Sequence, residues 1–294
     1  MKQLFFILLA TATWNVQAQK TYVLGDQTHL CGPISLADLQ QEPFAEWFSE
    51  NYNVELNLGA KQKWVKRLKD VNVDIYLGSW CGDSRKWVPR FVKLWDELDL
   101  DRSQLNFIAL YNLEGKQKQG PNGEEVGKKI FRVPTFIFER EEQEIGRIVE
   151  FPASTLETDL AHIAFGYPSA PRYQAANYLL DIFENQAADE VSANLNTHYH
   201  HLYKLVQRSN ELNSLGYLLI EKGQLEEALV VFHLNSFLFK TDPNVFDSYA
   251  EALLEAGMFA ESLRNYEKAL KMDPENENVT AQLALLMEKM ASKE

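Results

Sequence analysis

Trp80-Cys81-Gly82-Asp83-Ser84 is the stretch whose residue types could do chemistry most directly. It follows the apolar run Val71 to Leu77, which predicts a buried strand, and it precedes Arg85 to Leu98, which has the apolar spacing of an amphipathic helix. At such a strand-to-helix turn several backbone N–H groups lack partners and the helix dipole is positive. That environment favours a thiolate, which is the nucleophile in disulfide chemistry. We therefore expect Cys81 to be a reactive thiol.

Two later features join this stretch in a pattern that resembles thioredoxins. Pro89 lies eight residues after Cys81, and Val133-Pro134-Thr135 is followed by a second apolar strand pattern. The resemblance covers about residues 60–167 and implies a thioredoxin-like α/β domain. It also implies that Pro89 kinks the helix after the cysteine and that Pro134 is a cis proline packed beside the reactive sulfur.

The resemblance also implies roles within the site. Cys81 would attack a substrate disulfide and hold it as a mixed disulfide, Ser84 would donate a hydrogen bond to the thiolate, and Pro134 would shape the groove for a protein or peptide substrate. The expected substrate-binding residues are Trp80, Gly82, Asp83 and Val133. We expect no cofactor and no metal in this site.

Two departures from the thioredoxin pattern bear on activity. Ser84 stands where that family has a second cysteine, and Ile75 stands where it has a buried carboxylate. Asp74 is one place off and should face the other way in a strand. Because Ser84 cannot form a disulfide with Cys81, the dithiol cycle of the family is not available. Two interpretations stay open: a thiol-disulfide oxidoreductase with one reactive cysteine, and a redox-inactive protein-interaction module.

Cys31 is the second cysteine of the chain, and it lies in the turn-like sequence Cys31-Gly32-Pro33. It could be an inert thiol, a resolving partner for Cys81, or a cysteine that pairs with another molecule. A disulfide would need the two Cα atoms within about 7 Å, which a sequence does not determine.

The composition and the first residues indicate where the protein works. A net charge of −13 argues against nucleic acid and anionic membrane surfaces as partners. Met1 to Ala18 has the layout of a secretory signal peptide, with Lys2 before an apolar core. No other stretch is long and apolar enough to span a bilayer. We therefore expect a periplasmic or secreted protein without a membrane span after cleavage.

The first half of the chain has the pattern of an α/β domain behind a lead-in segment, residues 19–59. The lead-in holds a helical stretch, Leu36 to Tyr52. In residues 60–167 the patterns first predict a basic amphipathic helix (Ala60 to Asp70), followed by the strand and the helix on either side of Cys81. A second strand (Leu105 to Tyr111), a polar loop (Asn112 to Gly127) and an edge hairpin (Thr135 to Phe138 with Ile145 to Val149) come next. The last element is a helix that begins with a capping box at Ser154 and ends at Gly166.

The second half is predicted to be entirely helical, with a helical linker at 168–209 and repeats at 210–294. Gly216, Gly223, Ala228 and Phe232 recur at one fixed interval as Ala250, Gly257, Ser262 and Tyr266. This interval resembles the period of tetratricopeptide repeats, and the resemblance implies that the helices dock a protein partner. His198 and His201 could share a helical face, but no further ligand is placed to complete a metal site.

Overall fold

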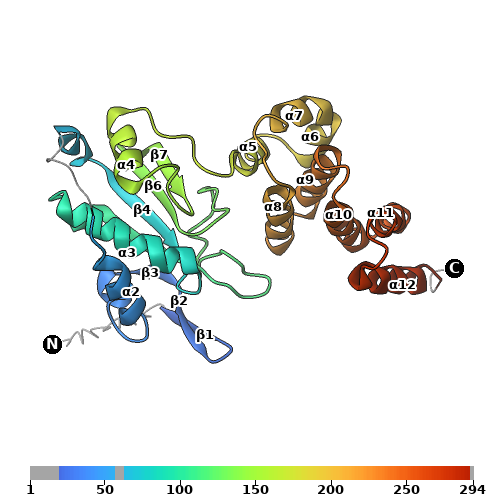
Figure 1. Cartoon of the computed structure of the whole chain (residues 1–294), viewed down its shortest axis with the longest axis horizontal. Helices are drawn as coiled ribbons and strands as arrows, with labels where there is room; N and C mark the ends of the chain where they lie inside the picture. Colours follow the sequence, from blue (N-terminus) through green and yellow to red (C-terminus); the bar gives the residue numbers. More distant parts are fainter. Residues whose placement is uncertain (1–19, 57–62, 292–294) are drawn as a thin grey trace, which may run out of the picture.

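The computed structural model describes residues 20–56 and 63–291. It has two parts, a lobe that contains all its strands, between residues 21 and 149, with the helix at 156–165 packed on them, and a helical region between residues 174 and 291 (Figure 1). The predicted order of an α/β part followed by an all-α part is confirmed at this level. The predicted signal segment, Met1 to Ala18, lies outside the described residues. Within the described ranges no helix has the length and apolar character to cross a membrane.

A five-stranded mixed sheet forms the first lobe, with strand order β3-β5-β4-β6-β7. Its strands are β3 (Gly32–Ile34), β4 (Asn72–Leu77), β5 (Leu105–Ala109), β6 (Thr135–Arg140) and β7 (Gln143–Val149). β4 and β5 are parallel, because helix α3 (Gly82–Glu97) connects them, and the other neighbours are antiparallel. β6 and β7 form the predicted hairpin at the sheet edge. A separate hairpin of β1 (Thr21–Leu24) and β2 (Gln27–Leu30) precedes the sheet.

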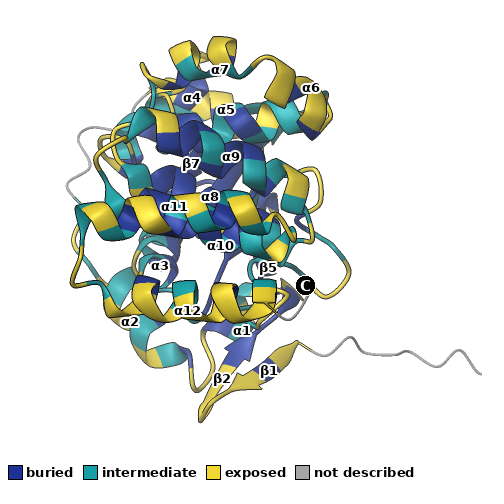
Figure 2. Cartoon of the chain, turned by 90° about the vertical axis from the view of Figure 1, so that its right-hand side faces the viewer, coloured by how far each residue is buried: buried dark blue, intermediate teal, exposed yellow. Residues whose placement is uncertain are grey.

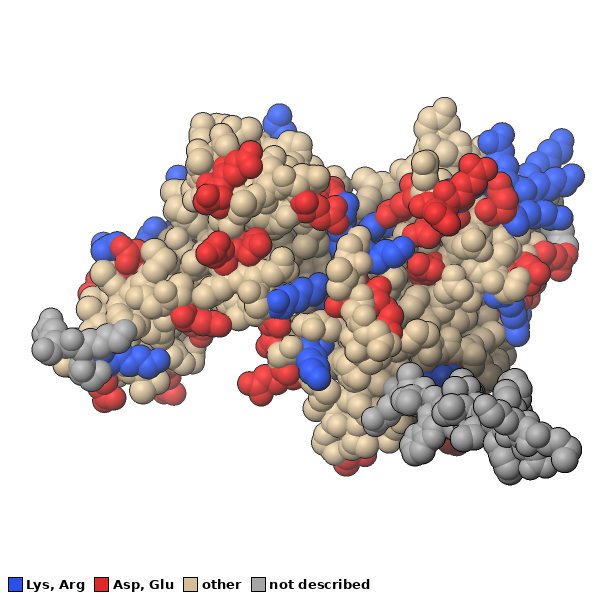
Figure 3. Space-filling view, turned by 180° about the vertical axis from the view of Figure 1, so that it is seen from behind, with Lys and Arg blue, Asp and Glu red and all other residues tan. Residues whose placement is uncertain are grey.

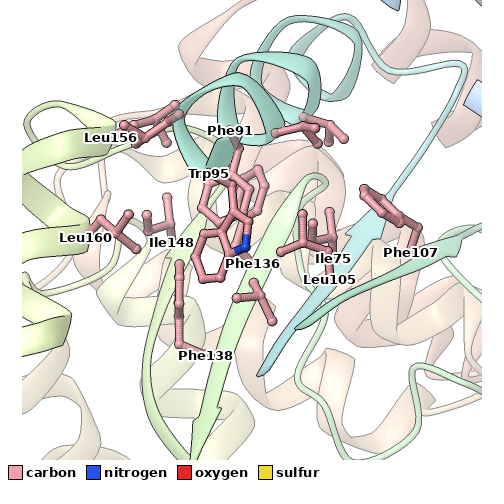
Figure 4. Packing of buried hydrophobic residues seen from close by; sticks show 14 of the residues in the cluster. Ile75, Phe91, Trp95, Leu105, Phe107, Phe136, Phe138, Ile148, Leu156 and Leu160 are labelled. Atoms are coloured by element: carbon pink, nitrogen blue, oxygen red, sulfur yellow. The ribbon is translucent and has the colours of Figure 1, made fainter. Parts of the chain in front are cut away.

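One face of the sheet carries the main core (Figure 4). Phe91 and Trp95 of α3 point towards the sheet, and the ring centroids of Phe91 and Phe136 are 4.6 Å apart. Helix α4 (Leu156–Phe165) adds Leu156 and Leu160 to the same core. Pro89 lies inside α3 and is buried, while the kink that the resemblance implies stays a prediction. This core therefore fixes α3, and with it the cysteine at its N-terminus.

The opposite face of the sheet has a smaller apolar cluster near the cysteine turn. Tyr76, Ile108 and Ile137 pack there with the side chain of Val133. Asp74 lies on this face, where it accepts a hydrogen bond from Asn106 at 3.0 Å, while Ile75 is fully buried in the main core. The prediction that Asp74 faces away from the position of Ile75 is confirmed.

Two of the predicted helices are wrong in extent or type. The stretch Leu36 to Tyr52 is two helices, α1 (Leu36–Leu39) and α2 (Ala45–Tyr52), because Pro43 between them has no N–H to continue a helix. The basic segment is a 3₁₀ helix, η1 (Lys63–Leu68), in place of a longer α-helix, and residues 60–62 of that prediction lie outside the described ranges. A short 3₁₀ turn, η2 (Arg102–Gln104), precedes β5.

The start of α4 also differs by one residue. Thr155, and not Ser154, is its N-cap, because the Thr155 side chain accepts a hydrogen bond from the N–H of Thr158 at 3.1 Å. Gly166 ends the helix in the left-handed conformation, as predicted.

The helical region stacks helices whose starts repeat at a fixed interval. Its helices are α5 (Gln174–Phe183), α6 (Ala188–Ala193), α7 (Leu195–Leu202), α8 (Ser209–Glu221), α9 (Leu225–Leu238), α10 (Pro243–Glu255), α11 (Phe259–Met272) and α12 (Glu277–Ala291). The interval from the start of α8 to that of α10 equals the interval from the start of α9 to that of α11. Figure 2 shows these helices with buried residues on their inner faces.

The small residues of the repeat lie where the helices approach one another. A Cβ added at Gly216 would come within 2.4 Å of the Phe232 ring. Ala228 and Ser262, which occupy equivalent positions, are both fully buried. The period that the sequence predicted therefore corresponds to the spacing of real helix contacts.

Candidate active site

Cys81 lies at the N-cap of α3, directly after the turn that follows β4. The turn is closed by a hydrogen bond from the N–H of Cys81 to the carbonyl of Gly78 at 2.9 Å. Gly78 has no room for a side chain, because an added Cβ would lie 2.5 Å from the Trp80 ring. Strand, glycine turn and helix together present the cysteine at the positive end of the α3 dipole.

The sulfur of Cys81 is brought next to the loop that precedes β6. Its Sγ donates a hydrogen bond to the carbonyl oxygen of Val133 at 3.2 Å, and the side chain is partly exposed. The Val133–Pro134 peptide bond is cis, as predicted, and Pro134 is buried. Cys81, Val133 and Pro134 therefore meet at one place although 52 residues separate Cys81 from Val133.

The neighbours of Cys81 along the chain hold the turn. Trp80 donates from Nε1 to the carbonyl of Leu110 at 2.9 Å. Ser84 is fully buried, and its Oγ accepts a hydrogen bond from the N–H of Gly78 at 3.1 Å. Gly82 is exposed and Asp83 partly exposed in the first turn of α3. Ser84 thus supports the turn that presents the sulfur, while its expected donation to a thiolate stays a prediction.

Arg85 is part of this arrangement, although no pattern in the sequence singled it out. Its Nε donates to the carbonyl of Ser79 at 2.7 Å, and the Ser79 hydroxyl accepts from the N–H of Leu30 at 2.9 Å. The cysteine turn is therefore tied to the segment that contains Cys31.

Cys31 is 1% exposed and lies immediately before β3. Burial raises the pKa of its thiol, and a hydrogen bond with Tyr111 acts in the opposite direction. Cys31 and Cys81 are not joined in a disulfide, and they adjoin strands β3 and β4, which β5 separates. A resolving role for Cys31 stays a prediction.

Arg132 connects the loop of Val133 to the helical region. One of its terminal nitrogens donates to the hydroxyl of Ser214 on α8 at 3.1 Å. Its guanidinium also lies 4.9 Å from the ring centroid of Phe131 and 5.2 Å from that of Tyr173. Phe131 itself is buried in the core of the helical region. The backbone that accepts the hydrogen bond of Cys81 is thereby fixed to α8.

The polar loop after β5 makes a second contact with α8. The backbone N–H of Gly115 donates to the carboxylate of Glu221, and the Gln119 side chain donates to the carbonyl of Glu221 at 3.4 Å. Within this loop the N–H of Lys118 donates to the carbonyl of Tyr111 at 2.9 Å. The polar loop that the sequence predicted therefore rests on the C-terminal end of α8.

Lys118 is the loop residue that interacts with the site. The pKa of its ammonium is lowered to about 8, chiefly by burial and then by the nearby cations Arg132 and Lys222, while Cys81 and Glu150 act in the opposite direction. Lys222, which follows the last residue of α8, also has a pKa lowered by burial, and the charge of Glu125 acts against that shift. Lys118, Arg132 and Lys222 therefore lie near one another in a protein whose net charge is −13, and Lys118 also interacts with Cys81.

Lys222 lines a cavity of about 420 Å³ between the loop and the helical region. Gln119 and Glu125 line it from the loop, and Leu180 and Leu219 line it from α5 and α8. In the space-filling view, basic and acidic side chains lie side by side along the seam where the two parts of the molecule meet (Figure 3).

None of these cations is among the residues singled out from the sequence. A signal existed for two of them, because Arg132 directly precedes Val133-Pro134 and Lys118 lies in the polar loop. Lys222 lies more than a hundred residues from Cys81, and nothing in its surroundings in the sequence marks it.

The histidines of α7 have packing roles. The hydroxyl of Tyr178 hydrogen-bonds Nδ1 of His198 at 2.8 Å, and the Tyr178 ring stacks on His201 with centroids 4.2 Å apart. In residues 20–56 and 63–291 no group of three or more His, Cys, Asp or Glu residues is placed to hold a metal ion.

No protein-family model matches the chain, and no curated protein matches it at a significant level.

Proposed function

We propose that the protein is a thiol-disulfide exchange protein in which Cys81 is the single reactive cysteine. The observation that carries the proposal is the position of the Cys81 sulfur. It is partly exposed at the N-terminus of α3 and lies 3.2 Å from a carbonyl of the loop before β6. A helix N-terminus stabilises a thiolate, and the thiolate is the attacking species in disulfide exchange.

The arrangement of the first lobe supports a thioredoxin-like fold. The parallel β4–α3–β5 unit, the antiparallel β6–β7 hairpin and the closing helix α4 follow one another in the order expected for that fold. The equal intervals between the helix starts support a tetratricopeptide-like region. In this proposal the helical region docks a protein partner whose disulfide meets Cys81.

The proposed reaction is a single exchange step. The Cys81 thiol gives its proton to water, and the resulting thiolate attacks one sulfur of a substrate disulfide. A bond forms between the two sulfurs while the substrate S–S bond breaks, and its electron pair leaves with the other substrate sulfur as a thiolate. The product is a mixed disulfide, and Ser84 gives it no internal route of release.

The compartment follows from the same chemistry. Disulfides form and persist in exported compartments, and they are rare in the cytosol. We propose a periplasmic or secreted location, in which Met1 to Ala18 act as the signal peptide.

The test replaces Ser84, which lies one turn along α3 from Cys81. Ser84→Cys should shorten the lifetime of the mixed disulfide and confer disulfide reductase activity, because the new thiol can attack the Cys81–substrate bond. Ser84→Ala is the matched control: both variants lose the hydrogen bond to Gly78, worth about 1 kcal/mol, but only one gains a thiol. Mixed disulfide is measured by intact mass after incubation with a peptide disulfide.

Cys31 requires its own variant in this test. Cys31→Ala should lengthen the lifetime of the mixed disulfide only if Cys31 resolves it. If Ser84→Cys behaves like Ser84→Ala and no mixed disulfide forms on Cys81, the exchange function is wrong. The chain is then better described as a redox-inactive interaction module.

A further inference from the structure

Buried or partly buried lysines on and beside the polar loop, together with Lys222 after α8, fall into two kinds. Lys128 pairs with Glu139 at 2.7 Å, and Lys129 pairs with Asp181 and Glu184. Lys118 has the neutral amide oxygen of Gln117 as its hydrogen-bond partner at 3.0 Å. In the part of the chain that the structure describes, neither Lys118 nor Lys222 has a carboxylate within the 4.0 Å of an ion pair.

For Lys118 and Lys222 the environment disfavours the charged form of the ammonium group. Burial acts to lower the pKa of all four lysines, but at Lys128 and Lys129 the hydrogen bonds and charges of carboxylates outweigh it, so that only the pKa of Lys118 and of Lys222 is lowered. Lys222 and Arg132 also act on Lys118 as like charges. A desolvated cation without a carboxylate partner costs free energy, and a second cation beside it adds to that cost. An anion that bound between them would offset both terms.

Space for such an anion exists beside Lys222. The cavity of about 420 Å³ that Lys222 lines also contains Gln119, the residue after Lys118. Two carboxylates also line this cavity, and both have other partners: Glu125 accepts from the backbone N–H of Gly120 at 2.8 Å, and Glu184 pairs with Lys129 at 3.2 Å.

Lys118 also lies close to the reacting sulfur. Cys81 is among the charges that act on Lys118. The backbone N–H of Lys118 donates a hydrogen bond to the carbonyl of Tyr111. The carbonyl of the preceding residue, Leu110, accepts a hydrogen bond from Trp80, the neighbour of Cys81. An anionic group held by the two lysines would therefore belong to the molecule that reacts with Cys81.

We propose that Lys118 and Lys222 bind a carboxylate of the disulfide substrate, so that Cys81 prefers disulfides with an acidic group close to their sulfur atoms. This inference rests on the proposed exchange function and adds its substrate class. The step remains the exchange described above, with the carboxylate held in place and chemically unchanged.

The test compares two aromatic disulfides that differ in charge. Dithiobis(nitrobenzoate) carries a carboxylate on each ring, and dithiodipyridine is neutral. Rates of exchange are measured in a Cys31→Ala background, so that Cys81 is the reacting thiol. Lys118→Gln or Lys222→Gln should slow the reaction with dithiobis(nitrobenzoate) about tenfold, the effect of losing one charge-assisted hydrogen bond. The reaction with dithiodipyridine should change by less than about twofold.

Lys116→Gln is the matched control, because Lys116 lies on the same loop and is exposed. It removes the same charge and should leave both rates unchanged. An equal slowing with both disulfides would overturn the inference, since the lysines would then act on Cys81 and not on the substrate. A failure of Cys81 to react with either disulfide faster than a model thiol would instead count against the exchange function itself.

Two further measurements use the protein with both lysines intact, so they do not depend on whether a lysine variant folds. The ratio of the two rates, charged over neutral, should fall as salt rises, because screening weakens the attraction of the lysines for the carboxylate. The ratio should also fall as the pH rises through about 8, where Lys118 loses its proton in the field of Arg132, Lys222, Cys81 and Glu150. Any effect of pH that is common to the two reactions cancels in the ratio. A ratio that ignores both salt and pH would overturn the inference.

Two peptide disulfides, flanked by Glu or by Gln, identify the source of the carboxylate. A preference for the Glu peptide assigns the site to acidic protein segments. A preference confined to the aromatic pair assigns it to small thiol acids.

Discussion

Burial disfavours the charged form of Lys118, so the free energy of unfolding depends on pH through this residue. Its pKa is lowered from 10.5 to about 8 in the folded protein, chiefly by burial. Between these two values the unfolded chain keeps a proton that the folded chain has lost. The unfolded state then binds more protons, so the contribution of Lys118 makes the protein more stable as the pH rises from about 8 to 10.5.

Lys118→Met should therefore stabilise the protein at pH 7, by about 1–2 kcal/mol once solvent screening is allowed for. The gain should shrink as the pH rises above 8 and be lost near 10.5. Denaturant unfolding at several pH values measures it. The exposed Lys116→Met provides the comparison, and a gain of equal size there would contradict the assignment of a desolvated ammonium at Lys118.

At the residue scale, the contact between Cys81 and the Val133-Pro134 loop could be predicted, because local sequence patterns mark both segments. Cys81 after a strand, Pro89 eight residues later and Val133-Pro134 before another strand define a turn, a helix and a loop, and the structure brings Cys81 and Val133 together. Lys222 could not be found in this way, because its position depends on how the helical region docks on the polar loop. The apolar periodicity of each part reflects its own core, so it does not show where the two parts contact each other.

At the element scale, the repeat of helix pairs is the feature with the most direct structural consequence. Ala228 on α9 and Ala269 on α11 are fully buried at helix contacts. Ala228→Glu or Ala269→Glu would place a large charged group in an apolar contact, and each should cost at least about 3 kcal/mol of the free energy of unfolding. Thermal unfolding followed by the helical circular dichroism signal measures the loss.

The exposed Ala260 on α11 offers a matched control for this experiment. Ala260→Glu lies in the first turn of the helix, where a negative charge is favourable, so its stability should change by less than about 1 kcal/mol. Equal melting temperatures for the buried and exposed variants would count against the repeat.

The boundary errors at this scale have local causes. The helix predicted over Leu36 to Tyr52 carries the right apolar residues on both sides of Pro43, but periodicity alone does not report a missing N–H. At α4 both Ser154 and Thr155 are good capping residues, and the choice between them follows from the position of the first buried residue, Leu156.

At the scale of the whole molecule, Phe131 links the two parts. It lies two residues before Val133, yet its ring is 1% exposed within the core of the helical region. Phe131→Ala should lower the free energy of unfolding by about 3–5 kcal/mol, the usual cost of removing a buried aromatic ring. Because the residue is shared, the loss should be seen both by helical circular dichroism and by tryptophan fluorescence.

Phe165→Ala makes the same change at a ring that is 50% exposed at the end of α4. Its effect should stay below about 1 kcal/mol. If Phe131→Ala were no more destabilising than Phe165→Ala, the helical region would not depend on the loop of Val133.

The central claim is that Cys81 is a nucleophile in disulfide exchange, and its rate of reaction with hydroxyethyl disulfide at pH 6 tests it most directly. The measurement uses the Cys31→Ala protein, follows the mixed disulfide by intact mass, and takes glutathione as the model thiol. We expect Cys81 to react about ten times faster than glutathione, because the N-terminus of α3 stabilises the thiolate at a pH where an ordinary thiol is almost fully protonated. A rate equal to that of glutathione, or an adduct that still forms in Cys81→Ser with Cys31 intact, would contradict the account.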